Sequence, residues 1–226
     1  PYSVDEQVIF KRLVEAYQMP VTHLSHFLNV LEGGPELFLE RNLLRFPEPI
    51  NASGAYGSAI HKAIEAIITY PRFYGGEKAT LEHIIAVFDR TLSRARLPKE
   101  EDTKQRERGH KLLVQYYKER GGYFVHTDQV EVDMKNEGVI VEGAHLTGKL
   151  DFLRTESTGI HVRDFKTGKA FSSWDRTKGD HEKVKLHNQK MQLIFYKILL
   201  ENSSRFKEFS IDSLTLEYVE GNDDAN

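Results

Sequence analysis

The sequence contains no cysteine and no long apolar run. Without cysteine, disulfide bonds, thiol catalysis, cysteine-ligated zinc and iron–sulfur clusters are all excluded. No apolar segment approaches the roughly 18 residues that a membrane-spanning helix needs, and the N-terminus lacks the basic-then-apolar pattern of a secretion signal. We therefore expect an intracellular, cytoplasmic protein without a membrane partner.

Charge of one sign is not in large excess either. The formal net charge is −3 over 226 residues, so nucleic-acid binding would need a local basic patch. The hydrophobic share of 39% supports a packed core. Because the chain begins at Pro1 and ends on "VEGNDDAN", we expect a fragment of a longer protein that forms a single domain over residues 1–226.

Roughly the first 120 residues are predicted to be helical, because apolar residues recur in them at helical spacing. A Gly33-Gly34-Pro35 break interrupts this pattern once. We expect a helical lead-in over residues 1–53 and a helical insertion over about 75–120. The individual helical segments are residues 4–18, 21–46, 53–70, 80–97 and 100–121.

After Gly121-Gly122 the pattern changes to the alternation of strands. Three antiparallel strands are predicted, separated by the hairpin signals "KNEG" and "TESTG". A charged loop, a helix and a last strand follow. The predicted fold is α/β, with the order α-β-β-β-α-β and a mixed sheet flanked by helices. These segments are strands at 128–134, 139–153 and 159–168, a loop at 169–188, a helix at 189–203 and a strand at 213–220.

The strand "VRDFKTG" carries Asp164 and Lys166 on one face, because residues two apart on a strand point the same way. A tight turn at 157–158 would bring Asp151 directly opposite Asp164. Facing carboxylates, with Cβ atoms roughly 4.5–5.5 Å apart, are destabilising without a cation. Two interpretations are open: an Mg²⁺ or Mn²⁺ site for phosphodiester hydrolysis, or a salt-bridge ladder with Lys149 on a solvated face.

Two predicted helices carry further polar candidates. His61 and Glu65 lie one turn apart, so both can reach one point beside the sheet. Gln192 and Tyr196 repeat this spacing on the later helix. The alternatives are a hydrogen-bonded core histidine in the first helix and core packing around a buried tyrosine hydroxyl in the second.

Four motifs, taken in order, resemble the RecB-type branch of the PD-(D/E)XK nuclease superfamily. "GSAIHKAIE" is similar to the family's first-helix histidine motif, "LTGKLDFL" to its G-x-h-D strand, where h is apolar, "VRDFKTGK" to its D-x-K strand and "QLIFY" to its Q-x-x-x-Y helix. The resemblance covers most of residues 54–200 and implies a restriction-endonuclease-like core over 54–220. Residues 21–49 are similar to the segment that opens the nuclease domain of UvrD/Rep-type helicases and AddA/AddB-type proteins.

The resemblance implies roles for individual residues. Asp151 and Asp164 would bind the metal, together with the backbone carbonyl of Phe165 and with His61. Lys166 would orient or help to deprotonate the attacking water and stabilise charge in the transition state. Several relatives hold an iron–sulfur cluster with four cysteines, which this chain lacks.

The remaining polar residues near these motifs receive weaker roles. By the same resemblance, Gln192 and Tyr196 would position the lysine, the water or the DNA backbone. Glu65 and Glu131 belong to no sharp motif, and Asp133 shares the strand face of Glu131. Glu131 could be an acid close to the metal, but we interpret Glu65 and Glu131 as structural rather than catalytic.

The stretch from residue 166 to residue 190 is locally basic and is predicted to clamp DNA. Trp174 could stack on an unpaired base, which is worth roughly 1–3 kcal/mol. The alternative is a solvated loop whose charges bind nothing. The predicted DNA-binding residues are Lys169, Trp174, Arg176, Lys178, Lys183, Lys185 and Lys190.

These features together predict a divalent-metal-dependent DNA nuclease. The resemblance implies exonuclease-like processing of single-stranded or unwound ends in recombination and repair, alongside a helicase. No P-loop motif is present, so the helicase or ATPase would lie elsewhere in the same chain or in a partner subunit. The alternatives are a catalytically silent DNA-binding or scaffold module and a hydrolase for another phosphate ester.

Overall fold

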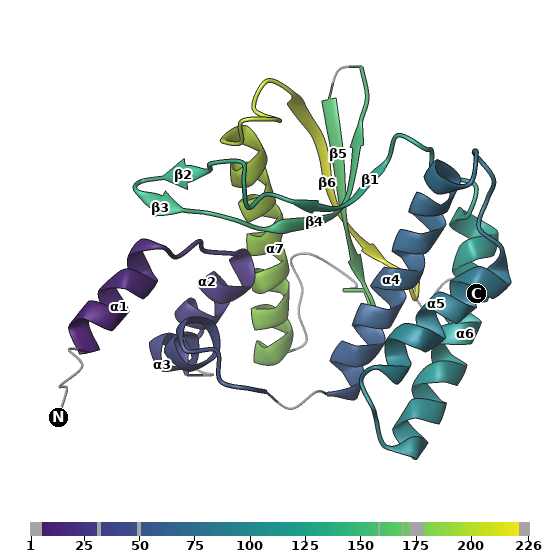
Figure 1. The fold of residues 1–226 in the computed structure, drawn as a ribbon, viewed down its shortest axis with the longest axis horizontal. Coiled ribbons are helices and arrows are strands. Elements are labelled where there is room, and N and C mark those ends of the chain that lie inside the picture. Colours follow the sequence, from purple (N-terminus) through teal and green to yellow (C-terminus); the bar gives the residue numbers. More distant parts are fainter. Residues whose placement is uncertain are drawn as a thin grey trace. The chain divides into compact units, whose positions relative to one another are not determined.

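The structure is a computed structural model (Figure 1), and it describes residues 6–30, 33–48, 51–157, 159–168, 170–171 and 179–221, with the backbone alone at 6–10 and 180–181. Its elements, in chain order, are α1 (Glu6–Glu15), α2 (Val21–Leu28), α3 (Gly34–Phe38), the π-helix η2 (Leu39–Leu43), α4 (Ala52–Phe73), α5 (Leu81–Ser93), α6 (Lys99–Arg120), β1 (Gln129–Asp133), β2 (Ile140–Val141), β3 (Ala144–His145), β4 (Lys149–Thr155), β5 (Gly159–Lys166), α7 (Asp180–Glu201) and β6 (Ser210–Tyr218).

The chain divides into two compact units, each of which is described by itself. Unit 1 comprises residues 1–48, 133–149 and 184–208. Unit 2 comprises residues 49–132, 150–183 and 209–226. The expectation of a single nuclease domain over 1–226 stays a prediction.

The principal sheet of the described residues has four strands in the order β1-β4-β5-β6. β4 and β5 pair antiparallel, with Phe152 opposite Arg163. β5 and β6 pair parallel, with Asp164 opposite Leu216. The sheet is therefore mixed, and the element order α4-β1-β4-β5-α7-β6 confirms the predicted α/β class with its restriction-endonuclease-like core.

Two predicted boundaries were wrong. The single strand expected over 139–153 is divided, because Glu142 and Gly143 both have positive φ values, 48° and 81°, and turn β2 back onto β3. The loop expected over 169–188 ends earlier, since α7 begins at Asp180. Leu186 and Gln189 are buried three residues apart, so the helical period was present among the charged residues that suggested a loop.

Helix α4 forms the centre of the core of unit 2. It begins at Asn51, whose side chain accepts the Gly54 N–H at 2.6 Å and thereby caps the helix. Its buried stripe includes Ile60 and Ile64 and packs in one cluster with α5, α6 and the aromatic residues of the sheet. The helix predicted over 53–70 is therefore confirmed, and its buried stripe holds the polar edge of the helix beside the strands.

The insertion formed by α5 and α6 packs tightly against this core (Figure 1). Phe88 of α5 is fully buried, and a β-carbon added at Gly109 of α6 would lie 2.1 Å from its ring. Glycine at this position allows the two helices to approach closely. The α5–α6 insertion, predicted over about 75–120, is thus part of the folded core of unit 2.

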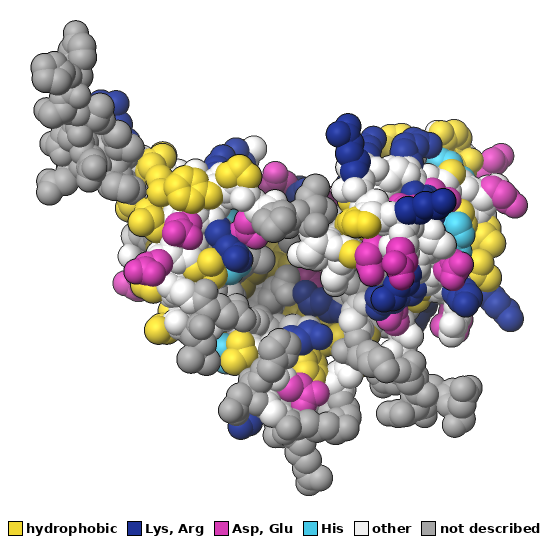
Figure 2. Space-filling view, turned by 90° about the horizontal axis from the view of Figure 1, so that it is seen from below, with side chains coloured by type: hydrophobic (Ala, Val, Ile, Leu, Met, Phe, Trp, Pro, Cys, Tyr) yellow, Lys and Arg dark blue, Asp and Glu magenta, His cyan; other side chains and the backbone are white. Residues whose placement is uncertain are grey.

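Basic and acidic side chains are interspersed over the described atoms on the face shown in Figure 2. This mixture matches the small net charge of −3. Any nucleic-acid site must therefore be found in local geometry rather than in a surface of one sign.

Candidate metal centre

The register of β4 and β5 determines where the two predicted acids lie. The paired positions run from Thr155 opposite Ile160 to Phe152 opposite Arg163, and the next position in this register is Asp151 opposite Asp164. This confirms the register predicted from a turn at 157–158. Only 15% of the Asp151 side chain and 3% of the Asp164 side chain are exposed, so the interpretation as a ladder on a solvated face was wrong.

His61 reaches the ends of these strands from α4. Its Nε2 atom lies 2.9 Å from the carbonyl oxygen of Phe165, and its Nδ1 atom lies 3.5 Å from Oδ2 of Asp151. When Nε2 donates to the carbonyl, the lone pair of Nδ1 faces a carboxylate oxygen, which is an unfavourable pairing of two acceptors. A cation between these atoms would satisfy both, so the geometry fits a metal-binding role for His61.

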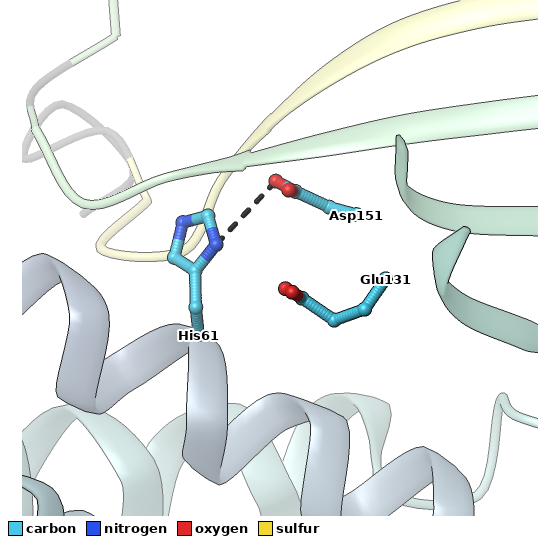
Figure 3. Close-up of side chains that lie close together, drawn as sticks. All are labelled: His61, Glu131 and Asp151. Atoms are coloured by element: carbon cyan, nitrogen blue, oxygen red, sulfur yellow. Dashed lines mark ion pairs between the residues drawn. The ribbon is translucent and has the colours of Figure 1, made fainter. Parts of the chain in front are cut away.

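Glu131 of β1 lies close to two other groups that could hold a metal ion. His61, Glu131 and Asp151 each offer one ligand atom, and these atoms all lie within 4.8 Å of one another. The three side chains point toward one another in Figure 3. One imidazole nitrogen and two carboxylate oxygens suit Mn²⁺, and the carboxylates also suit Mg²⁺.

The sequence interpretation of Glu131 as structural therefore missed its place in this set. Glu131 has a φ of 51°, which is unusual for a residue other than glycine inside a strand. Such a conformation redirects the side chain relative to regular strand alternation. Neither motif nor periodicity reports a backbone angle, so the sequence offered Glu131 only as a possible acid close to the metal and could not decide between the two roles.

Asp164 and Lys166 form an ion pair on β5. The Nζ atom of Lys166 lies 2.6 Å from Oδ2 of Asp164, which confirms that the two side chains share a face. The ammonium group partly offsets the cost of burying Asp164. Direct ligation of a metal by Asp164, or by the Phe165 carbonyl, stays a prediction.

Asp151 is poorly stabilised as an anion. The pKa of Asp151 is raised from its ordinary value of 3.8 to about 6, first because the carboxylate is buried and second because of the negative charge of Asp164. His61, the Phe165 N–H and Lys166 oppose this rise. The N–H of Phe165 donates to Oδ2 of Asp151 at 2.9 Å. A carboxylate in this state gains stability from a bound cation, so the donor set fits a divalent metal.

The other predicted active-site residues lie on α7. Nε2 of Gln192 donates to the hydroxyl of Tyr196 at 2.7 Å, so these two side chains do meet. Both residues belong to unit 1, whereas the candidate metal centre belongs to unit 2. Their role in positioning Lys166, the water or DNA stays a prediction. Glu65 pairs with Lys62 on the surface of α4, in agreement with a structural role.

The predicted DNA clamp is described only in part. Its described residues are exposed positions of α7, and their binding to DNA stays a prediction. These residues are Lys183, Lys185 and Lys190. The residues that lie outside the described part of the chain are Lys169, Trp174, Arg176 and Lys178.

A groove of about 440 Å³ opens beside the candidate metal centre. It lies within unit 2, and its lining includes two cations from α4 and from the end of α5. Arg94 follows the last residue of α5 as its C-cap and is exposed, and its guanidinium has no hydrogen bond or ion pair with the described residues. The groove thus joins positive charge and hydroxyl groups to two of the metal-binding groups. Its lining residues are Gly57, Ser58, His61, Lys62, Thr91, Arg94 and Glu131.

Comparison with known proteins agrees with this geometry. The family model of the PD-(D/E)XK nuclease superfamily matches residues 23–221, which is most of the chain. The chain belongs to the PD-(D/E)XK nuclease superfamily, whose members are hydrolases that cleave nucleic acids with divalent metals. No curated protein matched it. No helix in the described residues is long and apolar enough to cross a membrane.

The raised pKa of Asp151 predicts that Asp151→Asn stabilises the metal-free protein at high pH. Because the folded state binds this proton more tightly, the free energy of unfolding of the wild type falls as pH rises from about 4 to about 6. The variant lacks this loss, so at pH 8 in EDTA its free energy of unfolding exceeds that of the wild type by about 1–2 kcal/mol. Urea denaturation at pH 4 and pH 8 measures the difference.

Glu107→Gln is the matched control, because it removes one carboxylate from an exposed position of α6. This control has no comparable pH dependence. Mn²⁺ stabilises the wild type more than Asp151→Asn. An Asp151→Asn variant that is less stable than the wild type at pH 8 in EDTA would contradict the assignment.

Proposed function

We propose that this protein is a divalent-metal-dependent DNA nuclease that hydrolyses phosphodiester bonds. The observation that carries the proposal is the convergence of His61, Glu131 and Asp151 beside the Asp164–Lys166 ion pair. This convergence occurs on the fold of a nuclease superfamily. A bound Mg²⁺ or Mn²⁺ ion supplies an acidified water and positive charge for the phosphate.

The protein's own residues have separable tasks in this proposal. His61, Glu131 and Asp151 hold the cation, and the hydrogen bond from His61 to the Phe165 carbonyl fixes the imidazole ring. Asp164 fixes the ammonium group of Lys166 through their ion pair. Lys166 orients the attacking water and stabilises the negative charge that develops on the phosphate.

The groove beside the metal centre supports a path for the substrate strand. Lys62 is paired with Glu65, whereas the Arg94 guanidinium has no partner among the described residues. A phosphate next to the scissile bond would therefore be bound chiefly by Arg94, with Ser58 and Thr91 offering hydroxyl groups. This proposed path gives a role to Arg94, which lies in the α5–α6 insertion between α4 and β1.

The biological setting belongs to the same proposal. The resemblance of residues 21–49 and of the later motifs to RecB-type proteins supports exonuclease-like processing of single-stranded or unwound DNA ends. We propose an intracellular role in recombination and repair with a helicase, located in the same chain or in a partner subunit. A catalytically silent module is less well supported, because chemically competent residues fill the acid, lysine and histidine positions.

Replacement of Lys166 tests catalysis. Lys166→Ala is expected to lower Mg²⁺- or Mn²⁺-dependent cleavage of single-stranded DNA by about 100–1000-fold, because it removes transition-state stabilisation. The matched control is Lys111→Ala at an exposed position of α6, which should cleave at the wild-type rate. Full activity in a folded Lys166→Ala variant, judged by its thermal transition, would refute the proposed role.

Replacement of Arg94 tests the substrate path. We expect Arg94→Gln to raise KM for DNA roughly 3–10-fold with little change in kcat, because it removes one partly exposed charge-assisted hydrogen bond. Arg90→Gln removes the same charge from an exposed position of α5 that does not line the groove, and it should leave KM unchanged. Equal effects of the two substitutions in steady-state kinetics would exclude a specific contact.

A further inference from the structure

Unit 1 contains a cavity of about 750 Å³ that shares no residue with the candidate metal centre. The cavity is formed by the end of α1, the link between α1 and α2, the end of η2, and the segments on either side of the β2–β3 hairpin. Six of its lining side chains carry the argument below: Arg12, Tyr17, His23, Arg45, Lys135 and Lys149.

Hydrogen bonds within unit 1 hold the walls of this cavity in place. The N–H of Met19 donates to the carbonyl of His145 at 2.8 Å, and the N–H of Thr147 donates to the carbonyl of Met19 at 3.1 Å. Nε2 of Gln18 donates to the carbonyl of Lys135 at 3.2 Å. The link between α1 and α2 is thus hydrogen-bonded to both segments that flank the hairpin. These bonds fix the walls of the cavity within unit 1.

The cavity concentrates positive charge in a protein whose net charge is negative. Four cationic side chains and one carboxylate line it, and the carboxylate of Asp133 already accepts the backbone N–H of Lys135 at 2.8 Å. Arg12, Arg45 and Lys135 are exposed, and their side chains form no hydrogen bond or ion pair with the described residues. A concave surface lined by one sign of charge attracts ligands of the opposite sign.

The rings of Tyr17 and His23 also line the cavity. The hydroxyl of Tyr17 and Nδ1 of His23 lie 2.5 Å apart. Burial lowers the pKa of His23, and the positive charges of His26 and Arg45 lower it further, so its neutral ring can accept the Tyr17 hydroxyl proton. This bond holds the Tyr17 ring against the cavity. An aromatic ring beside cations is the combination that binds single-stranded nucleic acids.

The backbone conformation of Arg45 allows a specific test of its side chain. Arg45 has a φ of 56° and follows η2, where the N–H of Phe46 donates to the carbonyl of Glu40 at 3.0 Å and closes the helix end. Glycine is the usual residue in this left-handed conformation after a helix, because it has no β-carbon. An arginine here retains strain that glycine would avoid, so Arg45→Gly removes the side chain while the backbone keeps its conformation.

We propose that this cavity binds the phosphodiester backbone of a single-stranded nucleic acid. Arg45 binds a phosphate, Arg12 and Lys135 extend the positive path, and Tyr17 stacks on a base. The positive charge of the cavity selects an anionic ligand, while the identity of that ligand as a phosphate-bearing strand rests on the proposed nuclease function. The cavity thus supplies a contact to the substrate that lies outside the metal centre.

The test is the affinity of the full chain for a labelled oligothymidylate of twenty nucleotides, measured by fluorescence anisotropy in EDTA, where cleavage cannot occur. Arg45→Gly is expected to weaken binding about fivefold and to reduce the slope of log affinity against log salt by about 0.7, the value for one phosphate contact on a single strand. Its thermal midpoint should be unchanged or raised, because glycine relieves the strain.

Arg96→Gly is the matched control, because Arg96 also has a positive φ, 52°, and lines neither the cavity nor the groove. It should bind as the wild type does. Lys135→Gln is a second variant that leaves the backbone at Arg45 untouched, and it should also weaken binding. Equal losses in Arg45→Gly and Arg96→Gly, or unchanged binding in both Arg45→Gly and Lys135→Gln, would overturn the proposal.

Two further measurements distinguish a strand from a free nucleotide, and the cavity proposal from the nuclease proposal. Competition by thymidine monophosphate at the concentration of oligonucleotide phosphate would assign the cavity to a free nucleotide and would overturn the strand proposal. Weak competition by thymidine monophosphate would support the strand proposal. Because binding is measured without metal, a wild type that fails to cleave DNA with Mn²⁺ would refute the nuclease proposal while leaving the Arg45 result intact.

Discussion

The repulsion between two carboxylates is the constraint on which the site depends. The register of β4 and β5 places Asp151 opposite Asp164 where little of either side chain is exposed. Each acid has its own compensation: Lys166 pairs with Asp164, and the Phe165 N–H donates to Asp151. Even with these contacts, burial and the charge of Asp164 keep the pKa of Asp151 raised, so a cation here would stabilise the carboxylate. A divalent metal would supply that charge, and it would also supply the activated water of the proposed phosphodiester hydrolysis.

The packing of helix α4 in unit 2 positions His61 beside the buried carboxylate of Asp151. Its apolar stripe is held between the sheet and the α5–α6 insertion, so its polar edge cannot shift freely. His61 lies on that edge and contacts both the Phe165 carbonyl and Asp151. The same packing brings Arg94 to the groove. Core contacts of unit 2 therefore determine both the metal-binding geometry and the substrate path proposed beside it.

The sequence predicted the parts of the site that follow from strand and helix periods. The symmetry of a turn at 157–158 was sufficient to pair Asp151 with Asp164, and helical spacing placed His61 near the sheet. The sequence could not favour Glu131 over a structural residue, because the direction of its side chain depends on a backbone angle of 51° that no residue pattern reports. The groove residue Arg94 was missed for a related reason: it comes from an insertion, and its position follows from tertiary packing rather than from a motif.

The most direct measurement is anomalous diffraction at the manganese edge from crystals of the full chain grown with Mn²⁺. The account predicts an anomalous peak in contact with His61, Glu131 and Asp151, and its disappearance in Asp151→Asn. A manganese peak confined to exposed carboxylates elsewhere, or no peak among these three side chains at saturating Mn²⁺, would contradict the central claim that the facing acids exist to hold a catalytic metal.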